Sequence, residues 1–258
     1  MRRPFIASIS GKGGVGKTTL TALLLKVLLD ETVDDAILIV DADPAANLPE
    51  LVGVNYFRTI GDIVEDFRRK INDINNSGLE KTSLLQYLIM RDCLVETKSF
   101  DLLVMGRGEG EGCYCFVNSI LTHILVNLLK NYSVILMDME AGLEHLSRRV
   151  DKYVNTLIIV IDQSIMSLRT AERILSVMRE VNINPEKVYV VGNKISNSAL
   201  SKIVEWSKQN VVEYAGAIPY DEQIQEYSVQ GKPVLELPRE NKAVRAARII
   251  AYNIGLLD

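Results

Sequence analysis

The sequence is short of cysteine and histidine and has no long apolar run. It contains only 3 cysteines and 2 histidines among 258 residues. So few cysteines cannot form a disulfide framework, and in a reducing compartment a close pair of thiols is more often metal-binding or redox-active than a structural bridge. No run approaches the roughly 18 to 20 apolar residues of a membrane helix. The apolar stretch near the N-terminus is short and turns at once into a glycine loop, which does not fit a secretory signal. We therefore expect a cytoplasmic protein.

Excess positive charge and linker-like segments are missing too. The formal net charge is -4, which argues against a generic, sequence-independent nucleic-acid surface. No run rich in Pro, Gly or Ser divides the chain, and no internal repeat is found. Hydrophobic residues make up 48% and charged residues 24%, the ordinary balance of a folded protein with a substantial core. We expect residues 1–258 to form a single domain.

Short β-branched apolar segments alternate with helical patterns along the chain. Several segments are apolar at every position, which predicts an α/β fold whose mostly parallel sheet is covered by helices on both faces. The expected strands are residues 4–10, 36–43, 100–106, 132–138, 155–162 and 187–193, and the expected helices are 17–30, 117–130, 167–181, 198–210 and 241–254. Residues 55–98 predict a helical insertion, with helices at about 60–74 and 83–95 separated by the turn-forming segment NDINNSG.

The segment SGKGGVGKTTL follows the first predicted strand and opens the first predicted helix. It matches the phosphate-binding pattern GxxxxGKT in the structural context that this motif requires. Its glycines allow a tight turn that aims backbone amides at phosphate oxygens. Lys17 is expected to reach the β- and γ-phosphates, and the Thr18 hydroxyl to ligate Mg²⁺. The predicted nucleotide-binding residues of this loop are Gly13, Gly14, Val15, Gly16, Lys17, Thr18 and Thr19.

Lys12 adds a second lysine at the tip of the same loop. With a lysine at this place, GKGGVGKTT resembles the deviant Walker A motif of the SIMIBI class of P-loop ATPases, the family of MinD, ParA and the nitrogenase iron protein. The resemblance covers essentially the whole chain. It implies an ATP-dependent homodimer in which Lys12 crosses the interface to the partner's phosphates, where a cation neutralises transition-state charge as an arginine finger does.

Two further segments resemble the switches of this family. VDADPAANL resembles switch I, which implies that Asp43 positions or activates the attacking water and that Asp41 lies near the Mg²⁺ sphere. ILMDMEAGLEHL resembles switch II, with Asp138 as the Walker B carboxylate and Gly142 able to move with the γ-phosphate. The catalytic residues expected on this basis are Lys12, Lys17 and Asp43, and the expected Mg²⁺ ligands are Thr18, Asp41 and Asp138.

Two loops near the C-terminal end resemble the adenine site of the family. VVGNK implies that Asn193 contacts adenine, whose edge can be read by an asparagine because it is both donor and acceptor. GAIPYD implies a second flanking loop around Pro219. A preference for GTP would require an aspartate in an NKxD element, whereas this chain has Ser196 there. ATP is therefore the expected nucleotide.

GEGCYCF places Cys113 and Cys115 with one residue between them, and we expect a helix to begin there. Helix N-terminal amides lower the pKa of a thiol and favour the metal-binding thiolate. Two thiolates do not complete a coordination sphere, but a symmetric dimer would bring four together at its two-fold axis. Sulfur ligands accept Ni²⁺, Zn²⁺ or Cu(I), so the pair does not identify the metal. Cys93 lies in an apolar pattern and is expected in the core, and His123 and His145 are expected to be structural.

GCYC together with DMEAGLEHL resembles one branch of the family, the CooC-type accessory ATPases that insert nickel into carbon monoxide dehydrogenase. This implies delivery of Ni²⁺ to apo carbon monoxide dehydrogenase. Two alternatives remain open. One is a positioning ATPase of the MinD or ParA type, although the acidic composition and the lack of a basic C-terminal anchor favour neither nucleic acid nor membrane as a partner. The other is an electron carrier with an iron–sulfur cluster shared across the dimer, as in the nitrogenase iron protein.

Overall fold

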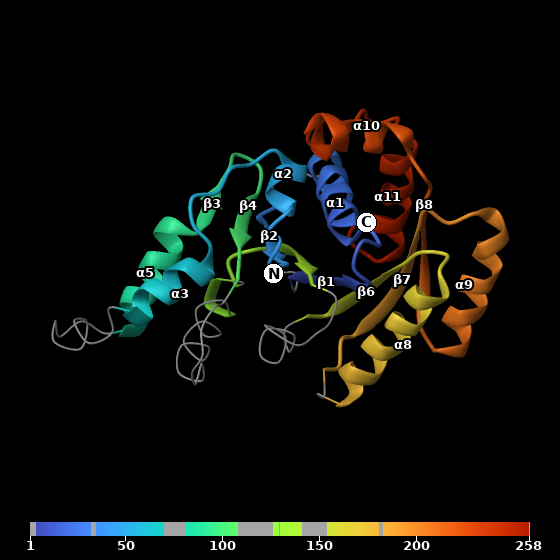
Figure 1. The fold of residues 1–258 in the computed structure, drawn as a ribbon, viewed down its shortest axis with the longest axis horizontal. Coiled ribbons are helices and arrows are strands. Elements are labelled where there is room, and N and C mark those ends of the chain that lie inside the picture. Colours follow the sequence, from blue (N-terminus) through green and yellow to red (C-terminus); the bar gives the residue numbers. More distant parts are fainter. Residues whose placement is uncertain are drawn as a thin grey trace.

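In the computed structural model, the described part of the chain comprises residues 4–31, 35–69, 81–107, 126–128, 130–140, 154–180 and 183–257. Its centre is an eight-stranded sheet in the order β3-β4-β2-β5-β1-β6-β7-β8 (Figure 1). Every neighbouring pair is parallel except β3 with β4. The strands are β1 (Phe5–Gly11), β2 (Ile37–Ala42), β3 (Leu94–Glu96), β4 (Asp101–Val104), β5 (Val134–Met139), β6 (Thr156–Ile161), β7 (Lys187–Asn193) and β8 (Glu213–Ile218). The predicted α/β class and mostly parallel sheet are confirmed.

Helices cover both faces of this sheet, as Figure 1 shows. Alternate residues of β1 belong to different hydrophobic clusters: Ile9 packs with the first layer of helices, and Ile6 packs with the second. The first layer contains α1 (Lys17–Glu31), α2 (Leu48–Val52), the short η2 (Val234–Glu236) and α11 (Lys242–Asn253), with α10 (Glu222–Gln230) beside them. The second contains α3 (Ile60–Arg69), α5 (Lys81–Asp92), α8 (Ile165–Glu180) and α9 (Asn197–Gln209). Burial on both faces explains the continuously apolar strands.

The predicted helical insertion contains two helices and also a strand. The second helix was expected to run to about residue 95, but α5 ends at Asp92 and Leu94–Glu96 forms β3, antiparallel to β4. The chain can reverse because the Thr97 amide and hydroxyl both donate to the Phe100 carbonyl, at 3.1 and 2.5 Å. The tight turn brings Leu94 opposite Leu103, so pairing with β4 replaces the last helical turn.

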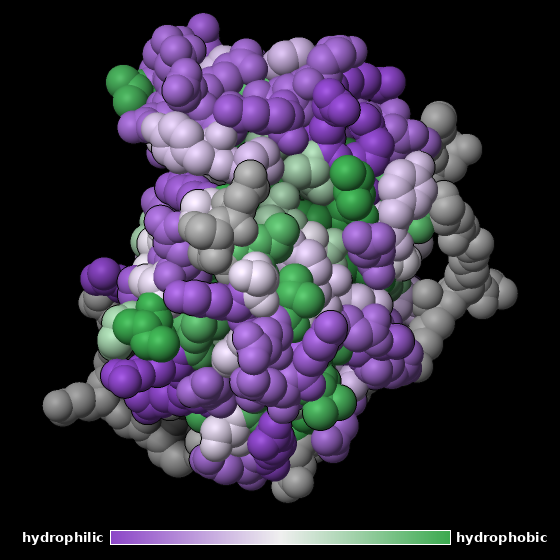
Figure 2. All heavy atoms as spheres, turned by 90° about the vertical axis from the view of Figure 1, so that its right-hand side faces the viewer, coloured by the Kyte–Doolittle hydropathy of each residue, from purple (hydrophilic) through white to green (hydrophobic). Residues whose placement is uncertain are grey.

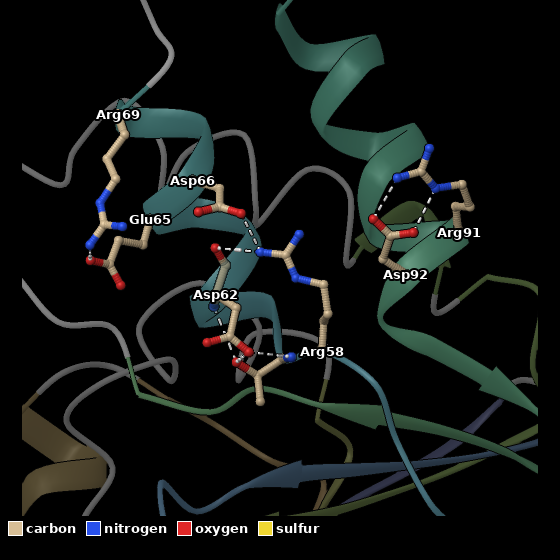
Figure 3. A network of polar contacts seen from close by, with 8 residues as sticks. Arg58, Asp62, Glu65, Asp66, Arg69, Arg91 and Asp92 are labelled. Carbon is tan, nitrogen blue, oxygen red and sulfur yellow. Dashed lines mark hydrogen bonds and ion pairs between the residues drawn. The ribbon is translucent and has the colours of Figure 1, made fainter.

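Three ion pairs between described residues lie on the surface of the insertion, residues 55–98. Figure 3 shows Arg58 bonded to Asp66, Arg69 to Glu65, and Arg91 to Asp92. Since exposed pairs of this kind contribute only about 0 to 1 kcal/mol each, they do not explain why α3 and α5 stay on the sheet. The apolar face of α3 does, because its residues Ile60, Ile63, Val64 and Phe67 are all buried.

Figure 2 faces the side of the molecule that carries β8 and α9, where hydrophobic residues are scattered among a hydrophilic majority. β8 is the last strand at this end of the sheet, and it contains an irregularity. Val190 of β7 pairs with Tyr214 and Val191 with Gly216, so Ala215 of β8 is an extra residue, and the Asn253 side chain of α11 donates to its carbonyl at 2.8 Å. Such features protect an edge strand against pairing with another chain.

The remaining helical predictions are met at residues 17–30, 167–181, 198–210 and 241–254, where α1, α8, α9 and α11 lie. The predicted helix 117–130 falls mostly outside the described residues, although 126–128 are helical. In the described part of the chain, no helix is both long and apolar enough to cross a membrane.

Candidate functional site

The glycine loop between β1 and α1 forms the base of the candidate site. A Cβ atom on Gly11 would lie 2.3 Å from the Val160 carbonyl oxygen of β6, and φ is +151° there. At Gly16, where φ is +97°, a Cβ atom would lie 2.1 Å from Asn193 Nδ2. Neither position accepts a side chain without a shift of its surroundings. These contacts fix the loop, and α1 begins at Lys17 as the sequence predicted. The first amides of a helix have no partner within it and can bind an anion.

Lys17 is only 6% exposed, although it is a lysine at the first position of a helix. Lysine is rarely buried unless it faces a negative charge. Burial raises the pKa of the nearby Asp138 carboxyl group, and the Lys17 charge offsets part of that rise. Thr18 and Thr19 follow in the same turn and are half-buried, and the Thr18 hydroxyl also acts on Asp138 in the direction that favours the carboxylate.

Asp41 and Asp138 end neighbouring strands and lie opposite each other in the register of β2 and β5. Both are buried, at 0% and 1% exposure. Burial is the main cause of the raised pKa of each group, to about 6 for Asp41 and to about 7 for Asp138. The two carboxylates and Asp43 also repel one another, which raises the pKa of Asp138 further.

The two buried carboxylates differ in their hydrogen bonds. The Asp41 oxygens accept from the Asp43 amide at 3.1 Å and from the Leu48 amide at 2.9 Å, so this side chain holds the loop that follows β2. No backbone amide of the described residues donates to either oxygen of Asp138, and the Thr18 hydroxyl, although near enough to favour the carboxylate, forms no hydrogen bond of normal geometry with it. A buried carboxylate of this kind beside a phosphate-binding loop fits a cation, and Asp138 fits Mg²⁺ better than Asp41.

Asp43 follows Asp41 by two residues, just after the end of β2, and is half-buried. One of its oxygens accepts from the Ala45 amide at 2.9 Å, while its carbonyl accepts from the Ala46 amide at 2.9 Å. Ala46 has a φ of +49°, an uncommon conformation for a residue with a side chain. The loop is thus a tight turn that fixes one Asp43 oxygen.

The predicted adenine residues lie on the opposite side of the glycine loop from the carboxylates. The order β2-β5-β1-β6-β7-β8 places Asp41 and Asp138 on one side of β1 and Asn193 of β7 on the other. Asn193 is 7% exposed and donates from Nδ2 to the Val15 carbonyl at 2.7 Å, so it braces the glycine loop. Its predicted contact with adenine, and that of Pro219, stay predictions.

Sequence reasoning missed the support of the Pro219 loop. The Lys194 amide donates to the Ile218 carbonyl at 2.9 Å, which ties the exits of β7 and β8 together. Asp221 caps α10 by accepting from the Ile224 amide at 3.1 Å, and it also accepts from Asn241 Nδ2 at 3.2 Å. Asn241 in turn caps α11. An Asp and an Asn each preceding a helical pattern were the available signals.

Cys113 and Cys115 lie outside the described residues, as do Gly142, His123 and His145. Cys93 is described: it is 0% exposed, and burial raises the pKa of its thiol to about 12. The expectation that Cys93 belongs to the core is confirmed. Within the described ranges, no three His, Cys, Asp or Glu side chains are grouped so that they could hold a metal ion. For Mg²⁺ this is ordinary, since proteins often bind it through one or two carboxylates plus substrate phosphates and water.

Comparison with known proteins agrees with this geometry. Residues 6–234 match the family model described as the CobQ/CobB/MinD/ParA nucleotide binding domain. The chain is similar to an uncharacterised ATP-binding protein of Methanocaldococcus jannaschii, with 43% identity over 250 residues that cover 96% of this chain and 98% of the relative. It is also similar to the carbon monoxide dehydrogenase accessory protein CooC of Rhodospirillum rubrum, with 31% identity over 84% of each chain.

The fold has close counterparts among solved structures. The cell division protein MinD of Aquifex aeolicus superposes with a TM-score of 0.70 over 98% of both chains, at 21% sequence identity. An identity this low supports the shared fold alone, and the family assignment comes from the matched family model and the two relatives above. The chain therefore belongs to the CobQ/CobB/MinD/ParA family of nucleotide-binding domains and is an ATPase of the MinD, ParA and CooC type.

Proposed function

We propose that this ATPase is a dimerising metallochaperone that delivers nickel for the maturation of carbon monoxide dehydrogenase. The observation that carries the proposal is the presence of the thiol pair Cys113 and Cys115 in a chain that has the complete ATPase loop, including Lys12. The 31% identity with an accessory protein of carbon monoxide dehydrogenase supports the choice of client. On this proposal nickel is cargo, and ATP binding and hydrolysis control its release.

The described residues fit the hydrolytic half of this cycle. Lys17 and the amides at the start of α1 bind the phosphates, and the buried carboxylate of Asp138 together with the Thr18 hydroxyl would hold Mg²⁺. The ion would neutralise charge on the phosphates. Asp43 orients the attacking water with the oxygen that the Ala45 amide does not use. Lys12 supplies its charge to the second subunit of the dimer.

The proposed cargo site uses four sulfur atoms, two from each subunit. Dimerisation through Lys12 would bring the two copies of Cys113 and Cys115 together on the two-fold axis. A site split between subunits depends on the dimer, so a step that opens the dimer would also weaken metal binding. Hydrolysis then couples naturally to release. Zn²⁺ in place of Ni²⁺ is compatible with the same ligands.

An anaerobic metal titration tests the thiol site. The wild type is compared with the double variant Cys113→Ser and Cys115→Ser and with Cys93→Ser, which alters the buried thiol only. We expect one Ni²⁺ per dimer for the wild type and for Cys93→Ser, and loss of that site in the double variant. Equal Ni²⁺ binding by all three proteins would contradict the proposal. Maturation of apo carbon monoxide dehydrogenase in the presence of ATP then tests the client.

A positioning ATPase of the MinD or ParA type is the second candidate, because the fold matches MinD over nearly its full length. This candidate predicts ATP-dependent binding to anionic lipid vesicles or to DNA. Sedimentation with vesicles, and a DNA mobility shift at low and moderate salt, separate it from the metallochaperone, for which we expect neither. A brown anaerobic preparation with absorbance near 400 nm would instead support a dimer-bridging iron–sulfur cluster.

A further inference from the structure

The exit of β4 and the start of α3 meet in an unusually close backbone contact. The Gly61 amide donates to the Met105 carbonyl at 2.9 Å. A Cβ atom on Gly61 would lie 2.1 Å from the Arg107 carbonyl oxygen. A Cβ atom on Gly106, where φ is +65°, would lie 2.4 Å from Thr59 Cβ. We call this contact, formed by residues 59–61 and 105–107, the α3–β4 clasp.

The end of β4 is also hydrogen-bonded to β2, the strand that precedes the Asp43 loop. The Met105 amide donates to the Asp41 carbonyl at 2.8 Å, which extends the pairing of β4 with β2 by one residue. The carboxylate of Asp41 holds the amides of Asp43 and Leu48. Asp41 therefore contacts the Asp43 loop, residues 43–48, through its side chain, and it contacts the clasp through its backbone.

The α3 side of the clasp is stiffened by hydrogen bonds, as Figure 3 shows for the polar groups around Asp62. The Thr59 amide and hydroxyl both donate to Asp62 Oδ2 at 2.8 Å, and the Asp62 amide donates back to Thr59 Oγ1 at 3.1 Å. This is a capping box, which fixes the first turn of a helix. Arg58 adds bonds to the Asp62 carbonyl at 3.2 Å and to Asp66 Oδ2 at 2.5 Å.

A contact of this kind transmits displacement efficiently. Side chains can absorb a small shift by changing rotamer, but at Gly61 and Gly106 backbone packs on backbone or on a capped threonine. A movement of β2 at Asp41 would therefore reach Arg107 and α3 with little loss. Arg107 lies six positions before Cys113 in the sequence.

We propose that the α3–β4 clasp relays the state of the nucleotide site to the backbone at Arg107, with Gly61 and Gly106 as positioning residues. The relay rests on the proposed function in one respect, because ATP and ADP must act differently on the Asp43 loop. It goes beyond that function by naming the route through which nucleotide state reaches the chain that leads to the thiols. It also predicts that α3 responds to nucleotide although it lies on the sheet face opposite α1.

Trypsin cleavage after Arg107 reads out the relay without any metal. Arg107 is exposed, and the fragment that ends there is measured by mass spectrometry relative to cleavage after the exposed Arg179. The full chain is compared with Mg²⁺ and ADP, and with Mg²⁺ and a non-hydrolysable ATP analogue. We expect the two rates to differ at least threefold in the wild type. In Gly106→Ala the ratio should fall close to one, while affinity for both nucleotides is retained.

Gly231→Ala is the matched control, because Gly231 has a similar φ of +63° but no atom within 4 Å of an added Cβ. It should keep the wild-type ratio. Should Gly106→Ala fold poorly, Thr59→Ala opens the same contact without adding bulk and should also lower the ratio. Equal rates in the wild type with both nucleotides bound, or an unchanged ratio in Gly106→Ala, would overturn the relay. Failure of the wild type to bind the analogue would contradict the proposed function and the relay with it.

Discussion

Replacing Asp138 by asparagine is expected to stabilise the nucleotide-free protein at neutral and alkaline pH. The Asp138 carboxyl group is 1% exposed, and no backbone amide of the described residues donates to it. Burial raises its pKa from 3.8 to about 7. Between these values the native state binds more protons than the unfolded state, so the free energy of unfolding falls as pH rises through this window. Asparagine has nearly the same shape as aspartate but carries no charge, so the variant should not lose free energy of unfolding in this pH window.

The size of the effect follows from the two pKa values. At 1.36 kcal/mol per pKa unit, the raised pKa of Asp138 lowers the free energy of unfolding by roughly 1.7 kcal/mol at pH 5, where the native group is still protonated, and by roughly 4.3 kcal/mol at pH 8. Asp41 also has a raised pKa, but it is present in both proteins, so its contribution largely cancels in the comparison. Between pH 5 and pH 8, Asp138→Asn should therefore gain about 2 to 3 kcal/mol of stability relative to the wild type.

Urea unfolding followed by circular dichroism, without nucleotide or Mg²⁺, measures this difference at both pH values. Asp35→Asn is the control, since Asp35 is an exposed carboxylate, and it should show no such trend. The reasoning is refuted if the difference between Asp138→Asn and the wild type is the same at pH 5 and pH 8. It is also refuted if the variant is less stable at pH 8. In the presence of Mg²⁺ and ATP the wild type should be the more stable of the two proteins, because only the wild type gains the full free energy of ligand binding.

Three further variants test other parts of the molecule. Asp43→Asn should leave ATP binding intact and slow hydrolysis by about 10²- to 10⁴-fold, measured as phosphate release in a single turnover, whereas a large loss of affinity would contradict its role toward water. Lys12→Ala should weaken ATP-dependent dimerisation about tenfold or more in sedimentation experiments, and an unchanged dimer would remove Lys12 from the interface. Asp30→Asn should lower the free energy of unfolding by about 2 kcal/mol, between the values for exposed and buried pairs. The reason is that Asp30 binds Lys26 at 2.7 Å with both side chains about nine-tenths buried, and a stable variant would show that Lys26 finds another partner.

Much of the fold was predictable because the strands are apolar at nearly every position. That pattern arises only where helices cover both faces of a sheet, and all the strands so predicted are present. The prediction failed at Leu94–Glu96, where helical periodicity continued past Asp92 but pairing with β4 prevailed. The short helices α2 and α10 were missed because they are set by caps and by contacts with α1 and α11 and not by a long periodic pattern.

The sequence by itself determined the nucleotide chemistry, because a glycine loop with its lysine and threonine encodes its function within one contiguous segment. Only the tertiary structure decided how the acids divide their work. Asp41 and Asp138 are almost a hundred residues apart in the chain, yet they face each other across two parallel strands. Asp41 holds a loop, whereas Asp138 receives no backbone hydrogen bond from the described residues. The clasp at Gly61 and Gly106 was equally invisible in the sequence, since close approach of two backbones depends on which distant segments the sheet brings together.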